Sequence, residues 1–293
     1  MIHRMSLRLT DCIDYIEEMY EIYRPELSND NFIRTGFSGL DNEIKGIPYG
    51  CITLISSKIL HGKTSLALSI ALHAALEQKI TTVIVDSQKK DCNATMRLIA
   101  QFGKIPIQVL MMGGLVDDDW EKITHALDNL LGAPISIKDD KPGSTKELIS
   151  ELEATHSKNR IGLVVIDGWF DATDQAEIQN KHENSMRELY RFAVDSKIAV
   201  ILTAQLNQIL SRTESGIPSR RDVPFEISDL AETVLIPYSP VRNLLDEKKA
   251  EESGVAVYKR RNEPVFIPIE FDADIGLFYE EHGRALLKRI MAR

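Results

Sequence analysis

Short apolar runs alternate with helical patterns along most of the chain. The runs are rich in Val, Ile and Leu and nearly continuous, as at 162–167, whereas the stretches between them space apolar residues three and four apart, as at 183–196. Strands are expected at 51–56, 81–86, 134–138, 162–167, 198–204, 233–237, 254–260 and 265–271, and helices at 63–78, 92–103, 118–131, 144–156 and 183–196. Because continuous apolar strands are buried on both faces, the pattern predicts an α/β domain with a mostly parallel sheet and a C-terminal antiparallel hairpin.

A separate helical segment precedes this body. Between residues 9 and 23 the apolar side chains recur at spacings of three and four, at Ile13, Ile16, Met19, Tyr20 and Tyr23. This spacing predicts an N-terminal amphipathic helix, which would fold back on its own domain or dock on a neighbouring copy. Turn-forming residues follow, so we expect a helix and linker at 1–31, the α/β domain at 32–280 and a basic C-terminal tail at 281–293.

Composition narrows the class of protein. The chain has 293 residues, of which 43% are hydrophobic and 27% charged, and its formal net charge is -9. These values are typical of a globular protein and argue against one coated in nucleic acid, so a nucleic-acid contact would be a local patch. No apolar run approaches the roughly 18 residues of a membrane span, and the first ten residues lack an apolar signal core, so no membrane partner and a cytoplasmic location are expected. The three scattered cysteines indicate neither a disulfide framework nor a zinc site.

The most informative segment lies between the expected strand 51–56 and the expected helix 63–78. Its residues are Ser57, Lys58, Ile59, Leu60, His61, Gly62, Lys63, Thr64 and Ser65, and it carries the GK[ST] end of a phosphate-binding loop. Backbone N–H groups at such a helix start hold phosphates, Lys63 reaches the terminal ones, and the Thr64 hydroxyl binds Mg²⁺. His61 would approach a phosphate or point to solvent. The segment predicts ATP and Mg²⁺ as cofactors.

An acidic residue at the end of another strand supports the metal site. The apolar run 163–166 ends at Asp167, which suits a water-mediated contact with Mg²⁺. Many buried strands end in Asp, so this signal gains its meaning from the loop.

Together these features resemble the C-terminal, RecA-like ATPase domain of DnaB-type replicative DNA helicases, without the globular N-terminal domain of that family. The segments that carry the resemblance are Thr35-Gly36-Phe37, Leu40-Asp41, Gly46 and Gly50 before the loop, Gln205, Leu206 and Asn207 after a later strand, and Lys259-Arg260-Arg261-Asn262 near the end. The family tolerates a small residue other than glycine where Ser57 stands. The resemblance covers roughly residues 9 to 280.

The resemblance implies roles for several residues. Gln205 would sense the γ-phosphate, and Lys259 and Arg261 would reach the nucleotide of a neighbouring subunit in a homo-oligomeric ring, most simply a hexamer. The resemblance also implies contact with single-stranded DNA through the loop that carries Arg212, Arg220 and Arg221. That loop would grip phosphates or be an ordinary solvated segment.

One departure from the family concerns catalysis. Counting from Lys63 without a gap places Gln88 where the family has the Glu that activates the attacking water, and Arg97 then falls on a family Arg. Glutamine orients a water without accepting its proton, so slow hydrolysis is expected. A slip of one residue would put Lys89 there instead. The stretch 212–226 also lacks the family's usual sequence.

Two functions therefore remain open at this stage. The first is an ATP-hydrolysing ring motor of the DNA helicase type, acting on single-stranded DNA in replication. The second is a hydrolysis-impaired, helicase-like binding module that serves as loader, partner or regulator of a replicative helicase or another replication protein.

Overall fold

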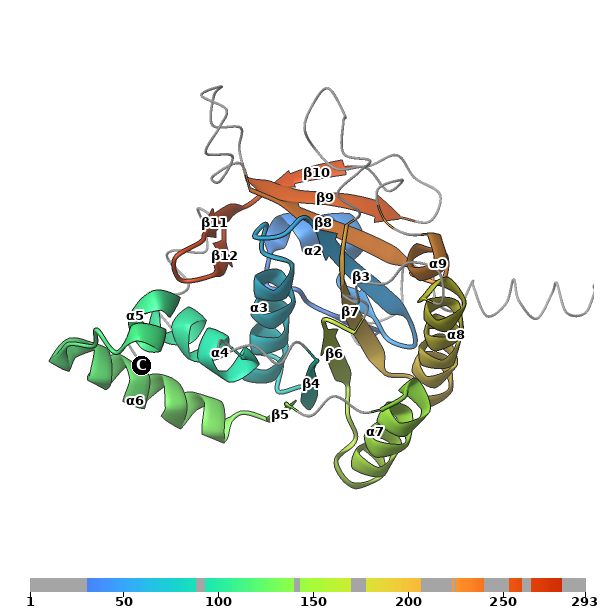
Figure 1. The fold of residues 1–293 in the computed structure, drawn as a ribbon, viewed down its shortest axis with the longest axis horizontal. Helices are drawn as coiled ribbons and strands as arrows, with labels where there is room; N and C mark the ends of the chain where they lie inside the picture. The colour runs from blue at the N-terminus through green and yellow to red at the C-terminus, as the bar shows by residue number, and fades with distance from the viewer. Residues whose placement is uncertain are drawn as a thin grey trace, which may run out of the picture.

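The computed structural model describes residues 31–87, 93–139, 143–169, 178–206, 223, 225–239, 253–259 and 265–280. An eight-stranded sheet forms the centre of this part of the chain, with the strand order β10-β9-β8-β3-β7-β6-β4-β5 (Figure 1). Its strands are β3 (Ile52–Ser57), β4 (Thr82–Asp86), β5 (Ile135–Lys138), β6 (Leu163–Asp167), β7 (Ala199–Gln205), β8 (Thr233–Tyr238), β9 (Gly254–Lys259) and β10 (Val265–Pro268).

The pairing of these strands confirms the expected sheet. The six strands from β8 to β5 pair in parallel, whereas β9 pairs antiparallel with both β8 and β10. The parallel strands therefore end at one edge of the sheet, and β9 runs back to the opposite edge.

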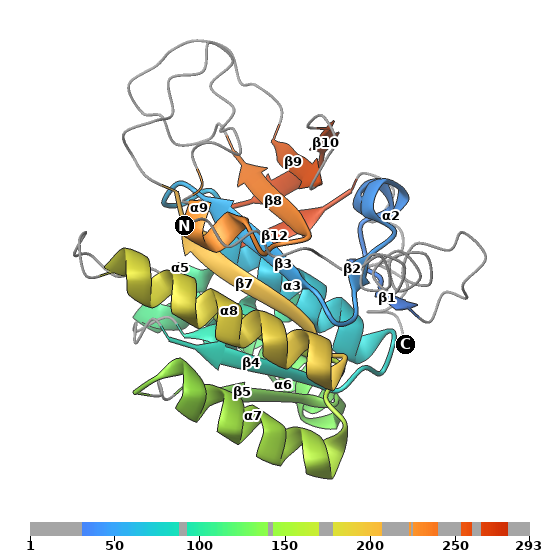
Figure 2. The same cartoon turned by 90° about the vertical axis from the view of Figure 1, so that its right-hand side faces the viewer.

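Helices cover both faces of the sheet (Figures 1 and 2). One side carries α3 (Lys63–Leu76), α4 (Ala94–Gly103), α5 (Ile107–Met112) and α6 (Asp117–Gly132), and the other carries α7 (Thr145–Asn159), α8 (Ile178–Ser196) and α9 (Phe225–Ser228). Strand side chains alternate between the two layers: Leu54 packs in the cluster with α7 and α8, and Ile55 packs in the cluster with α3 and α4. This arrangement explains why the strand sequences are nearly continuous in apolar residues.

Several small elements were not expected from the sequence. They are β1 (Phe32–Ile33), α2 (Ser38–Ile44), β2 (Ile47–Pro48), α5, α9, β11 (Glu270–Asp272) and β12 (Leu277–Tyr279). The run 265–271, expected as one strand, divides at Ile269 into β10 and β11, because β11 leaves the sheet to pair with β12. Helix α8 begins at 178 and not at 183.

Within the described residues, no helix is long and apolar enough to cross a membrane. The predicted N-terminal helix and the basic tail lie outside those residues.

Candidate nucleotide-binding site

The phosphate-binding loop connects β3 to α3, as the sequence predicts. Gly62 immediately precedes the helix with φ +87°, a left-handed conformation that strongly favours glycine. A Cβ atom there would also lie 2.7 Å from the ring of Phe278, so any side chain would clash. Both the backbone angle and the lack of space therefore require glycine at the start of the helix.

Sheet register brings the predicted Gln205 to this loop. Gln205 ends β7 and pairs with Ser57, the last residue of β3, and the N–H of Leu206 donates to the Ser57 carbonyl at 3.0 Å. Asp167 ends β6, the next strand along the sheet. The carboxyl ends of neighbouring parallel strands are the usual location of ligand sites in open α/β sheets.

Asp167 forms the polar centre of the site. The Thr64 hydroxyl lies 3.0 Å from both Asp167 carboxylate oxygens, and the Thr203 hydroxyl donates to Oδ1 at 2.5 Å. Thr203 in turn accepts a hydrogen bond from the N–H of Gly168 at 3.0 Å, which fixes its orientation. The structure thus joins the two residues that the sequence assigns to the metal, Thr64 and Asp167, although 103 positions separate them.

Competing effects act on the Asp167 carboxyl. Burial raises its pKa, while the hydrogen bond from Thr203, the positive charge of Lys63 and the hydrogen bond from Thr64 oppose the rise. The negative charge of Asp86 raises the pKa further. A hydroxyl and a carboxylate are oxygen donors of the kind that Mg²⁺ prefers, and a nearby dication would favour the ionised carboxylate. The donor set therefore fits Mg²⁺.

A second buried carboxylate stands beside Asp167 and was missed in the sequence analysis. Asp86 ends β4 and pairs in register with Asp167, and its Oδ2 accepts a hydrogen bond from the N–H of Ala94 at the start of α4. The N–H of Ser87 donates to the Asp167 carbonyl at 2.9 Å. The signal was present, since the run 82–86 is an apolar strand that ends in an acid, as 163–167 does. Gln88 and Lys89 lie outside the described residues.

A small hairpin packs against the loop from the C-terminal part of the chain. The rings of Phe271 on β11 and Phe278 on β12 stack with centroids 4.4 Å apart, and both approach Gly62. The buried side-chain amide of Gln101 donates to the carbonyls of Ser65 on α3 and Gly276 in the hairpin, at 3.1 and 2.7 Å. Gln101 therefore ties the first turn of the nucleotide helix to the hairpin, a contact between distant positions that no local pattern predicts.

His61 is held by protein contacts and does not simply point to solvent. Its Nδ1 accepts a hydrogen bond from the N–H of Ser239 at 3.1 Å, and its ring lies 5.5 Å from that of Tyr238. Burial lowers the pKa of His61, and the charge of Lys58 lowers it further. Both effects favour the neutral ring that this hydrogen bond requires. The neighbouring Ile59 and Leu60 are exposed at the tip of the loop.

Lys259, expected to act on a neighbouring subunit, is paired within its own chain. Its Nζ lies 2.6 Å from Oε1 of Glu43 on α2 and also donates to the Glu43 backbone carbonyl. The other residues with predicted roles outside this core, Arg212, Arg220, Arg221 and Arg261, lie outside the described residues.

The fold and the loop define the class of protein: an α/β nucleotide-binding domain with a RecA-like arrangement of its phosphate loop and acidic strand. Residues 33–280 match the family model of the DnaB-like helicase C-terminal domain, and the chain belongs to that family. The resemblance stated from the sequence and the expected fold are thereby confirmed.

Known proteins place this chain within the family. It is 25% identical over 263 residues to the replicative DNA helicase DnaB of Leifsonia xyli subsp. xyli, a match that covers 87% of this chain and 57% of that protein. It is 26% identical over 243 residues to the replicative DNA helicase DnaC of Bacillus subtilis, covering 80% and 53%. The chain thus spans little more than half the length of these relatives.

Solved structures agree on the fold. One of them, an ATPase domain solved by itself, superposes with a TM-score of 0.77 at 21% identity, covering 92% of this chain and 98% of that one. A DnaB-like replicative helicase, solved in a study of its interactions with primase, gives the same TM-score and identity, covering 91% of this chain and 66% of that one.

Proposed function

We propose that the protein is an ATP-dependent ring ATPase of the DNA helicase type that acts on single-stranded DNA in replication. The observation that carries this proposal is the joining of Thr64 and Asp167 at the start of α3, beside Gln205 on the adjoining strand. The relatives are replicative helicases themselves, which does not favour the alternative of a binding module.

The residues of this site divide the work on bound ATP. The loop amides and Lys63 would bind the phosphates, Gln205 would contact the terminal phosphate, and Thr64 and Asp167 would hold Mg²⁺. When bound, Mg²⁺ would supply positive charge against the phosphate oxygens. Thr203 would keep the Asp167 carboxylate oriented, because it already donates to that group.

Assembly into a homo-oligomeric ring is part of the proposal, with six subunits as the simplest number. In such a ring Lys259 and Arg261 would contact the nucleotide of the next copy. Helices α5 and α6 expose large apolar side chains, including Met112, Trp120 and Leu131, and exposed apolar patches commonly mark interaction surfaces. The apolar face predicted for residues 9–23 has matching chemistry.

DNA contact would come from the arginines of the loop after β7, namely Arg212, Arg220 and Arg221. A few phosphate contacts give salt-dependent binding without sequence preference, as suits a protein whose net charge is -9. We place this activity in the cytoplasm, with a replicative helicase or another replication protein as a further partner.

ATP turnover measured with and without single-stranded DNA tests the function. We expect Mg²⁺-dependent hydrolysis that single-stranded DNA stimulates, with the stimulation weakening as salt concentration rises. Absence of DNA binding in gel-shift and turnover assays alike would refute the motor function and leave a nucleotide-binding module.

A further inference from the structure

The contact between Lys259 and Glu43 fixes a side chain that would otherwise be highly flexible. A lysine ammonium has three N–H donors on a four-carbon stem, and here it meets both a carboxylate and a backbone carbonyl of the same residue. Glu43 lies in the last turn of α2, where the helix dipole also favours a cation. The Lys259–Glu43 pair therefore has one defined geometry within the chain.

Helix α2 is itself anchored, so Glu43 does not move freely with Lys259. The Glu280 carboxylate accepts hydrogen bonds from the N–H groups of Ser38 and Gly39, at 3.0 and 2.7 Å, at the first turn of α2. The Asp41 carboxylate accepts from both the N–H and the hydroxyl of Thr35, at 2.8 and 2.9 Å. Separation of the pair would therefore come from rotation of the Lys259 side chain.

Sheet register keeps Lys259 away from the phosphate loop of its own chain. Lys259 lies level with Thr233, and Thr233 lies level with Thr53, four residues before the end of β3. With about 3.3 Å per residue along a strand and about 4.8 Å between strands, the backbone of Lys259 lies roughly 16 Å from the start of that loop. Phosphates that this lysine meets would therefore belong to another copy of the chain.

The exposure of the pair makes exchange feasible. The side chains of Lys259 and Glu43 are 31% and 28% exposed, so solvent and a docking molecule reach them. Pairs of this kind contribute little to stability, whereas separating a fully buried pair is strongly unfavourable. A nucleotide triphosphate carries several negative charges against the single charge of Glu43.

We propose that Glu43 is a positioning residue that holds Lys259 in reserve, and that Lys259 exchanges Glu43 for the nucleotide phosphates of an adjacent copy when the ring assembles. This inference rests on the proposed function, since it requires a neighbour that presents nucleotide. The exchange makes assembly depend on bound ATP, because without phosphates Lys259 stays with Glu43.

The experiment measures the concentration of a non-hydrolysable ATP analogue, with Mg²⁺, that gives half-maximal assembly by light scattering. Glu43→Gln removes the charge and keeps the shape, so Lys259 should leave more readily and that concentration should fall about two- to fivefold, the range expected for a partly exposed ion pair. Glu43→Ala should act in the same direction. Lys259→Ala should raise the concentration, and Glu43→Gln should then have no effect in the Lys259→Ala background.

The Lys138–Glu151 pair supplies a matched control, because Lys138 and Glu151 are 32% and 44% exposed and join the end of a strand to a helix in the same way. Glu151→Gln should leave the half-maximal concentration unchanged. If Glu43→Gln raises the concentration, or acts equally in the Lys259→Ala background, the exchange is overturned. If Lys259→Ala assembles as the wild type does, the contact between subunits fails instead, whatever Glu43 does.

Discussion

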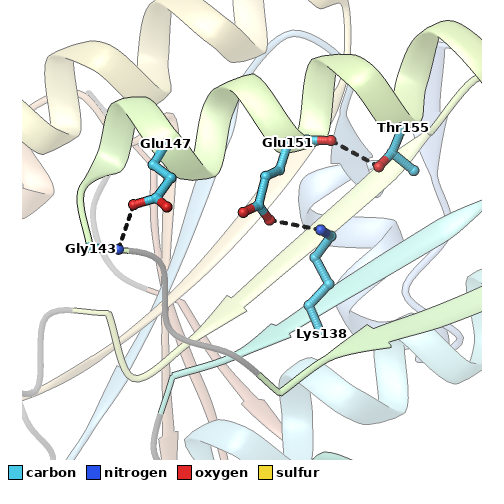
Figure 3. Close-up of polar contacts among 5 residues, drawn as sticks. All are labelled: Lys138, Gly143, Glu147, Glu151 and Thr155. Carbon is cyan, nitrogen blue, oxygen red and sulfur yellow. Dashed lines mark hydrogen bonds and ion pairs between the residues drawn. The ribbon is translucent and has the colours of Figure 1, made fainter.

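Two lysine–glutamate pairs, on opposite sides of the sheet, look alike locally and differ in their surroundings. Lys138 is the last residue of β5 and lies 2.8 Å from Oε2 of Glu151 on α7 (Figure 3). Lys259 is the last residue of β9 and lies 2.6 Å from Oε1 of Glu43 on α2. Each pair joins the end of a strand to a helix, and all four side chains are partly exposed.

The surroundings of the first pair indicate a purely local role. Glu147, one turn before Glu151, accepts a hydrogen bond from the N–H of Gly143, and the Glu151 carbonyl accepts one from the Thr155 hydroxyl, both at 2.8 Å (Figure 3). β5 is the edge strand, four strands away from β3. These contacts attach α7 to the edge of the sheet and involve no residue of the nucleotide site.

The second pair differs because β9 runs antiparallel to its neighbour. Its last residue lies at the edge of the sheet opposite the phosphate loop, and its carboxylate comes from a helix fixed by Glu280. Similar geometry therefore carries different functional meaning, and the difference comes from strand direction. A lysine–glutamate contact alone does not identify a functional residue.

The largest expected effect removes the difference between the pairs altogether. Lys63→Ala should abolish ATP binding, because the phosphates lose their main point charge. Without nucleotide, Lys259→Ala and Lys138→Ala should be equivalent, each leaving the oligomeric mass unchanged. Calorimetry and light scattering measure both results, and ATP affinity equal to that of the wild type would sink the assignment of the loop.

The next largest effect sharpens the comparison by making turnover easier to measure. Gln88→Glu supplies the carboxylate that takes the proton of the attacking water, so the hydrolysis rate should rise by about 10² to 10⁴-fold with little change in ATP affinity. In this faster protein, Lys259→Ala should reduce the rate clearly, whereas Lys138→Ala should not.

Lys89→Glu is the control for the assumed alignment and should accelerate hydrolysis much less. Faster turnover in that variant would show that the alignment is displaced by one residue. A gain below tenfold in Gln88→Glu would indicate that Asp86, which ends the same strand, already serves the water.

The sequence predicts the sheet and the loop well because both depend on local patterns. Strand β6 is a continuous apolar run ending in Asp167, and the loop is a contiguous segment, so neighbouring residues carry the signal. The position of Asp86 was within reach of the same reasoning. The alternation of strands and helices likewise follows from burial on both faces.

The remaining features depend on contacts between distant positions. The Lys259–Glu43 pair joins residues 216 positions apart, and Gln101 reaches a hairpin 175 positions further along the chain. Neither contact leaves a periodic pattern in the sequence. The hairpin of β11 and β12 was also missed because its strands have three residues each, too short to show alternation.

The smallest expected effect tests whether the Lys138–Glu151 pair is only a local attachment. Glu151→Gln should lower the free energy of unfolding by about 0.2 to 1 kcal/mol, as is usual for exposed ion pairs, and urea denaturation measures the change. Because salt screens exposed charges, the difference from the wild type should shrink between low salt and 1 M salt. Glu43→Gln should cause a loss of similar size in the nucleotide-free protein, since the two pairs are comparably exposed and differ only once a neighbour presents phosphates. A loss above 2 kcal/mol, or any change in ATP-dependent assembly on Glu151→Gln, would mean that the edge of the sheet at β5 also takes part in assembly, and the contrast between the two pairs would fail.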